Sequence, residues 1–225
     1  MNSVHIFWVA GAGFLGFLTS AIFGGVLRLQ RRWFLLPFTL AIGAFLAAYV
    51  VVNELDVINL MTRNLVWGLI GGALAAGILV KNVLSQPASR QGTVLDLLWA
   101  GVIYGTIDGL LLTVMPVVAM WQAFSTPRSM IAQFGIGVLA MLGSIYVTFT
   151  YHFGYPEFRG PGMMKAILGN AIITLTVLLT GSPLAAVLSH AAMHVVAVLH
   201  GPEMTIQLPP HYVRHDLGDA QAGTA

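Results

Sequence analysis

The chain has 225 residues, of which 57% are hydrophobic and 8% charged, with a formal net charge of +2. Soluble globular domains carry about 25% charged residues, so this chain has too few charges to cover a water-soluble surface. Intrinsic disorder needs low hydrophobicity and high charge and is excluded by the same numbers. The absence of cysteine excludes disulfides, iron–sulfur clusters and thiolate zinc sites. Ten basic residues spread over short loops make no nucleic-acid surface, which leaves a polytopic membrane protein.

Seven apolar segments reach or approach the roughly 20 residues that a helix needs to cross a bilayer. They predict an all-α, polytopic transmembrane helical bundle with about seven spans. The expected spans are 4–27, 33–52, 60–80, 94–121, 130–153, 166–181 and 184–200. The first is preceded by no basic residue and is followed at once by another span, so we expect a retained helix and not a signal peptide. The turn Gly181-Ser182-Pro183 predicts that the last two spans form a tight hairpin.

The basic residues predict the orientation, because cytoplasmic loops are enriched in Lys and Arg. With the N-terminus outside, the outer segments hold only Arg63 and Arg128. The cytoplasmic segments then hold Arg28, Arg31, Arg32, Lys81, Arg90, Arg159, Lys165 and Arg214. We therefore predict an N-out, C-in topology with a lipid bilayer around the bundle, a pattern that suits a prokaryotic inner (plasma) membrane.

Composition divides the chain into a front and a back part. Residues 1–81 are expected to form a three-helix membrane part, and residues 82–92 (NVLSQPASRQG) a polar connector. Residues 93–200 are expected to form a four-helix membrane core. Residues 201–225 begin with Gly201-Pro202, which ends the last helix, and are polar enough for a cytoplasmic tail.

Ionisable side chains inside a span cost about 2.5–3.5 kcal/mol at mid-membrane and therefore suggest a functional site. Asp108 lies near the middle of the fourth span, His152 ends the fifth, and the seventh holds His190 and His194. The two histidines of the seventh span are four residues apart and share one helix face. That spacing can seat two imidazoles on zinc or another divalent metal. A third ligand, from His152 or Asp108, would complete a catalytic arrangement with an open position.

Simpler explanations exist for each of these residues. A histidine in a membrane helix can hydrogen-bond to a neighbouring helix and do nothing else, which applies to His200 above all and also to the pair in the seventh span. Asp108 can pair with a hydroxyl or amide inside the bundle. Glu157 and Arg159 can pair with each other at the membrane interface.

The depth of each residue along its span leaves two arrangements open. At about 1.5 Å per residue, Asp108 and His194 fall near the bilayer centre, whereas His152 falls near the cytoplasmic end, close to the level of His200. One arrangement joins Asp108, His152, His190 and His194 in a single site. The other places Asp108 with His194 inside the membrane, and His152 with His200 and Glu157 at the cytoplasmic mouth.

Three stretches of the back half resemble motifs of one known family. Residues 179–194 (LTGSPLAAVLSHAAMH) resemble a threonine-glycine-serine turn that leads into a helix with a His-x-x-x-Asn motif. Residues 144–156 (SIYVTFTYHFGYP) look like a Phe-x-x-x-His segment, with Gly169 on the small-residue helix that follows. Residues 107–113 (IDGLLLT) stand where a Glu-Glu-x-x-x-Arg motif is expected. Over about residues 94–200 the chain thus resembles the CAAX prenyl protease and bacteriocin-processing (CPBP) family of intramembrane endopeptidases.

The chain departs from the family's pattern in each motif. Gly109 stands where the second glutamate is expected, and no arginine follows at the expected place. Thr148 occupies the phenylalanine position, and His194 replaces the asparagine. The resemblance therefore implies a diverged relative that retains one carboxylate and three imidazoles.

Three functions are consistent with these residues. The resemblance implies an intramembrane hydrolase in which Asp108 activates water while His152, His190 and His194 stabilise the oxyanion or bind a metal, with a peptide or lipid-linked substrate. The missing glutamate and arginine instead suggest a non-catalytic subunit or scaffold with membrane protein partners. A haem- or chlorin-binding redox subunit, with His152 and either His194 or His200 as axial ligands, is the third.

Overall fold

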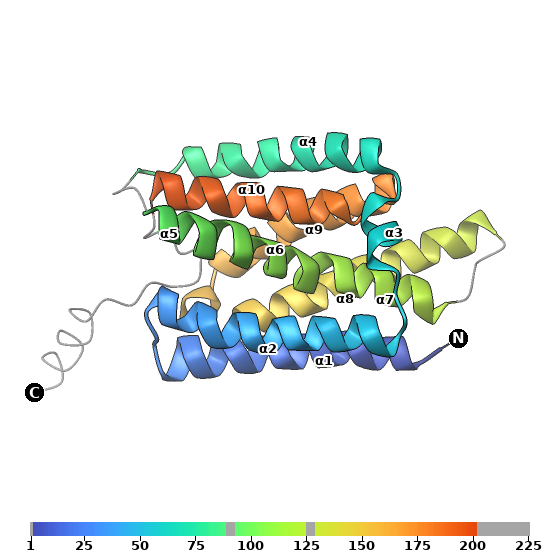
Figure 1. The fold of residues 1–225 in the computed structure, drawn as a ribbon, viewed down its shortest axis with the longest axis horizontal. Coiled ribbons are helices and arrows are strands. Elements are labelled where there is room, and N and C mark those ends of the chain that lie inside the picture. The colour runs from blue at the N-terminus through green and yellow to red at the C-terminus, as the bar shows by residue number, and fades with distance from the viewer. Residues whose placement is uncertain (1, 89–92, 125–128, 202–225) are drawn as a thin grey trace, which may run out of the picture.

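The computed structural model describes residues 2–88, 93–124 and 129–201, and the regular structure within these ranges is helical throughout. Six helices are long and apolar enough to cross a membrane, which identifies a membrane-type helical bundle (Figure 1). They are Val4–Val26 (α1 Val4–Thr19 and η1 Ser20–Val26), α2 Arg31–Val52, α4 Leu65–Leu84, Val94–Ala123, α8 Met130–Phe153 and α9 Gly162–Thr180. The predicted tail after Gly201 lies outside the described residues, as do Arg90, Arg128 and Arg214.

The seventh predicted span corresponds to α10, which runs from Leu184 to His200. Its 17 residues make it shorter than the other six, roughly 26 Å at 1.5 Å per residue against about 30 Å of hydrocarbon. The helix lies alongside α4, which also packs against α9, so α4 of the predicted front part contacts two elements of the back part (Figure 1).

The third predicted span, 60–80, is wrong at its start. A short helix, α3, covers Val57–Thr62, and its N-terminus is capped by the Asp56 side chain, which accepts a hydrogen bond from the Asn59 amide. Asn64 then adopts a left-handed conformation with φ 50°, and α4 begins only at Leu65. Asparagine is one of the few residues that adopt this conformation readily, so Asn64 separates α3 from α4.

The predicted hairpin between the last two spans is confirmed. Gly181 has φ 63° and ends α9 in the left-handed conformation that glycine adopts without a steric penalty, and Pro183 precedes the first residue of α10. The amide of Asn64 donates to the carbonyl of Thr180 at 3.0 Å and so satisfies a carbonyl at the end of α9. The start of α4 and the hairpin therefore lie at the same end of the bundle.

Further contacts show that the chain alternates between the two ends of the bundle. The Asn2 amide donates to the Ala123 carbonyl at 2.7 Å, which joins the start of the first helix to the end of the fourth span. At the opposite end of the bundle, where α4 and α10 finish, Nε2 of His200 donates to the Gln86 carbonyl at 2.6 Å. Which end faces the cytoplasm stays a prediction.

The fourth span, Val94–Ala123, runs through the centre of the bundle. Its apolar window is 72% buried, whereas the windows of the other five long spans are 22–33% buried and present apolar side chains outward. The span is not a uniform α-helix, because two wider π-helical segments flank the central turn. Its segments are α5 Val94–Asp96, η2 Leu97–Ile103, α6 Tyr104–Gly109, η3 Leu110–Val114 and α7 Met115–Ala123.

Glycines at four-residue spacing allow this central span to approach α10 closely. A methyl group on Gly105 would lie 2.9 Å from the Ala191 Cα atom and 3.0 Å from the His194 ring. A methyl group on Gly109 would lie 3.1 Å from Cβ of His190. Close contact between small residues is a common basis of helix association in membranes. Here it places the backbone next to Asp108 directly against both histidines of α10.

Gly105→Ala is expected to lower the free energy of unfolding by about 1–3 kcal/mol, because the added methyl group overpacks the contact with α10. The measurement is unfolding by SDS titration in mixed micelles. Gly77→Ala on α4 is the matched control, since the added methyl group has no described atom within 4 Å apart from its chain neighbours and its own helix backbone. The control should keep or gain stability, because alanine favours helix by about 1 kcal/mol over glycine. Equal effects of the two substitutions would contradict the close-packing interpretation.

Candidate metal site

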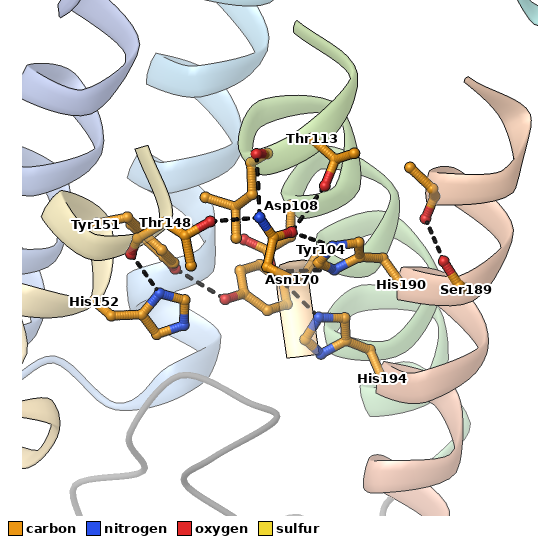
Figure 2. A network of polar contacts seen from close by, with 12 residues as sticks. Tyr104, Asp108, Thr113, Thr148, Tyr151, His152, Asn170, Ser189, His190 and His194 are labelled. Carbon is orange, nitrogen blue, oxygen red and sulfur yellow. Dashed lines mark hydrogen bonds and ion pairs between the residues drawn. The ribbon is translucent and has the colours of Figure 1, made fainter. Parts of the chain in front are cut away.

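Asp108 on α6 meets His190 and His194 on α10 inside the bundle (Figure 2). One carboxylate oxygen, Oδ2, lies 3.3 Å from Nε2 of His194 and 3.5 Å from Nδ1 of His190. All three residues are buried, with at most 4% of each exposed. Each offers one ligand atom, and these atoms all lie within 4.8 Å of one another. The protein therefore contains a buried Asp/His group that can bind a metal ion.

The helical spacing of the two histidines determines how their rings lie. The imidazoles of His190 and His194 are nearly parallel, with centroids 6.0 Å apart and 22° between the planes. The Tyr104 ring packs edge-on against His194 at 4.9 Å. Ligands on a tetrahedral zinc ion at 2.0–2.1 Å are separated from one another by about 3.3 Å. The two contacts to Asp108 match this separation.

The electrostatics of the site would favour a cation. A buried carboxylate is costly unless it is paired or bound to a metal. Within the described part of the chain, Oδ1 of Asp108 has no hydrogen-bond partner, and Nδ1 of His190 has only its 3.5 Å contact to Oδ2 of Asp108. Such unpartnered buried atoms are rare in native proteins and can indicate an ion.

A layer of neutral polar residues surrounds the site on the side of α9. Oδ1 of Asn170, a buried residue, lies 3.3 Å from Nε2 of His190. The same Oδ1 accepts from the Thr113 hydroxyl of the central span, and Nδ2 donates to the hydroxyls of Ser144 and Thr148 on α8 (Figure 2). Sequence analysis missed Asn170, because a single asparagine in an apolar helix has no characteristic spacing to a partner.

One cavity of about 340 Å³ joins the four residues that sequence analysis singled out. Asp108, His152, His190 and His194 all line it. His152, which the sequence predicts as a metal ligand, lies outside the three-residue ligand group. Its Nδ1 donates to the Thr148 carbonyl at 2.8 Å, and Asp108 supplies the third ligand atom instead.

Three other predicted site residues do not line this cavity. Nε2 of His200 donates to a backbone carbonyl at the end of the bundle, as described above. Arg159 is exposed, donates through Nε to the Phe153 carbonyl at 3.1 Å and places its guanidinium over the Phe153 ring. Glu157 is exposed in the short helix η4, Pro156–Phe158. The second predicted arrangement, His152 with His200 and Glu157, stays a prediction.

Three buried tyrosines that sequence analysis did not single out as site residues form a chain of hydroxyl groups along the cavity. The hydroxyl of Tyr151 lies 2.9 Å from that of Tyr104 and 2.9 Å from that of Tyr155. All three rings line the cavity. The four-residue spacing of Tyr151 and Tyr155 was the available signal, but tyrosines near a span end also fit the aromatic belt at a membrane interface.

Comparisons of the chain with protein-family models, with curated proteins and with solved structures find no match. The functional interpretation therefore depends on the contacts of the site. These contacts define a helical membrane protein with a buried Asp/His group that opens onto a cavity.

Tyr151→Phe is expected to lower the free energy of unfolding by about 1–3 kcal/mol, because it leaves buried hydroxyls of Tyr104 and Tyr155 without their shared partner. SDS titration in mixed micelles measures the change. Tyr146→Phe is the matched control on the same helix, since its hydroxyl is exposed and makes only a 3.5 Å contact to the Ala10 carbonyl. That variant should stay within about 0.5 kcal/mol of the native protein. A Tyr151 variant as stable as the control would refute a structural role for the hydroxyl chain.

Proposed function

We propose that the protein is a metal-dependent intramembrane hydrolase that holds its metal on Asp108, His190 and His194. The observation that carries this proposal is the convergence of three buried ligand atoms, from two helices, on the wall of a cavity. Two imidazoles and one carboxylate are a donor set of catalytic zinc sites, and three protein ligands leave one position open. A metal in such a site supplies an activated water molecule near neutral pH.

His152 fits the role of a proton-transfer group in this proposal. Its Nδ1 donates to the Thr148 carbonyl, so Nε2 is the nitrogen left to accept a proton. The residue lies on the wall of the same cavity as the ligand group but outside the group itself. His152 can therefore exchange a proton with a substrate, because it does not coordinate the metal in this proposal.

We also propose that residues 94–200 are related to the CPBP family of intramembrane endopeptidases. The meeting of Asp108 with His190 and His194, and the position of His152 in the same cavity, support the relationship. In this proposal a metal compensates for the missing second glutamate, and His194, in place of asparagine, adds an imidazole ligand. The substrate would be a peptide or a lipid-linked group, consistent with a cavity inside an apolar bundle.

The donor set itself favours a second candidate. Two histidines and one carboxylate with open positions also form the facial triad of non-haem iron(II) oxygenases. The two candidates differ in the metal they need, so metal content separates them directly.

Purified protein is expected to bind about one divalent metal ion per chain, as zinc for the hydrolase or iron for the oxygenase. Elemental analysis after exposure to equimolar zinc and iron(II) without oxygen measures the metal content per chain and the preference between the two metals. The visible spectrum tests for haem. The double variant His190→Ala/His194→Ala should lose the metal. His200→Ala is the matched control and should keep it, because His200 contacts the Gln86 carbonyl instead. Metal-free native protein would remove the basis of both candidates.

Hydrolysis can be tested before the substrate is known. Membrane extracts of peptides and lipids are incubated with the protein in ¹⁸O-labelled water, and mass spectrometry detects products that gain the label. Native protein should generate labelled products, and Asp108→Asn, which removes one ligand, should reduce them by at least about 100-fold, a loss on the scale of one general acid–base or electrostatic contribution. Metal binding without labelled products would reject the hydrolase and leave the oxygenase or a structural metal.

A further inference from the structure

A proline in the central span leaves one buried carbonyl dependent on a side chain. The residue four positions after Leu112 is Pro116, which has no amide hydrogen, so the usual i to i+4 hydrogen bond cannot reach the Leu112 carbonyl. Ser144 on α8 donates its hydroxyl proton to this carbonyl at 2.6 Å. Nδ2 of Asn170 lies at a longer 3.4 Å from the same carbonyl, so the Ser144 hydroxyl is its closest side-chain donor and directs its proton there.

This hydrogen bond fixes the orientation of the Asn170 side chain. Since Ser144 donates to Leu112, its oxygen can only accept from the Asn170 atom that lies 2.8 Å away, and that atom must be the amide nitrogen Nδ2. Thr148 gives the same result, because it donates to the Ser144 carbonyl and accepts from Nδ2 at 2.6 Å. The other amide atom, Oδ1, therefore faces away from α8.

The Asn170 orientation in turn places a proton on His190. Oδ1 accepts from the Thr113 hydroxyl at 2.8 Å and faces Nε2 of His190 at 3.3 Å. A carbonyl oxygen can only accept, so the hydrogen between these atoms belongs to Nε2. In neutral His190 this leaves Nδ1, 3.5 Å from the Asp108 carboxylate, as the nitrogen with an available lone pair.

We propose that Asn170 is a positioning residue that holds a proton on Nε2 of His190 and so makes Nδ1 the metal ligand. The ligand role of Nδ1 rests on the metal site proposed above, whereas the proton on Nε2 does not. Metal-binding histidines generally donate their second ring N–H to an oxygen, and loss of that partner weakens metal affinity by about 10–100-fold. A series of hydrogen bonds thus connects the Leu112 carbonyl, through Ser144 and Asn170, to one ring nitrogen of His190.

The proton position can be measured directly by NMR on protein with ¹⁵N-labelled histidine in detergent. Two-bond ¹H–¹⁵N correlations report which ring nitrogens are protonated, and His190→Gln identifies the signals of His190. We expect a proton on Nε2 with and without ¹¹³Cd²⁺, and a ¹¹³Cd coupling on Nδ1. An unprotonated Nε2, or a coupling on Nε2, would overturn the proposal. If no cadmium binds, the metal site fails, yet the proton on Nε2 still decides the role of Asn170.

Variants of Asn170 separate positioning from packing. Asn170→Leu removes the acceptor at similar volume and is expected to abolish the preference for Nε2–H and to weaken zinc binding by about 10–100-fold. Asn170→Asp keeps an acceptor and should keep the proton on Nε2. Asn82→Leu is the matched control, because Asn82 lines the same cavity but is exposed, and its zinc affinity should match the native protein. If Asn170→Leu keeps the native tautomer of His190 and the native zinc affinity, the positioning role of Asn170 is refuted. If that variant does not fold, the NMR measurement on native protein decides.

Discussion

The carboxylate of Asp108 is removed from water and must be stabilised by the protein or its ligand. In an apolar bundle the cost of an unpaired charge is high, so a buried carboxylate requires close partners. The two imidazoles of α10 can reach it only because glycines at positions 105 and 109 let the helices approach to backbone contact. The same proximity places the three ligand atoms at separations that fit a metal ion. Helix packing and site chemistry therefore follow from a single requirement.

The distribution of polar residues within the bundle follows from this requirement as well. The central span is largely buried, and it carries Asp108 and Thr113, while its neighbours present apolar side chains outward. Asn170 and Ser144 come from two different neighbouring helices and meet around a carbonyl that Pro116 leaves without its usual donor. Thr113, Ser144 and Asn170 thus each find a partner on another helix, which fixes the mutual rotation of these helices in an otherwise apolar core.

Sequence reasoning recovered the features that depend on local pattern. Span positions follow from hydropathy, the hairpin at Gly181 from turn chemistry, and the facing pair His190/His194 from helical periodicity. It failed where the outcome depends on three-dimensional packing. His152 had been expected at a different depth, but a cavity can extend over several helical turns and so join residues at different levels. Asn170 was missed because its partners lie 22 or more residues away in the chain, except for His190 and residues of its own helix.

The two π-helical segments on either side of Asp108 limit which insertions and deletions the central span can accept in related chains. A π-helical turn contains one residue more than an α-helical turn, and such turns are frequent at functional sites. Loss of one residue from η2 or η3 would return that segment to an α-helix and rotate one flank of the span by about 100° relative to Asp108. The carboxylate would then face away from α10, or Leu112 and Thr113 would lose their contacts with Ser144 and Asn170. Homologous chains that keep this site are therefore expected to conserve the number of residues across 97–114, even where they exchange the apolar side chains between them.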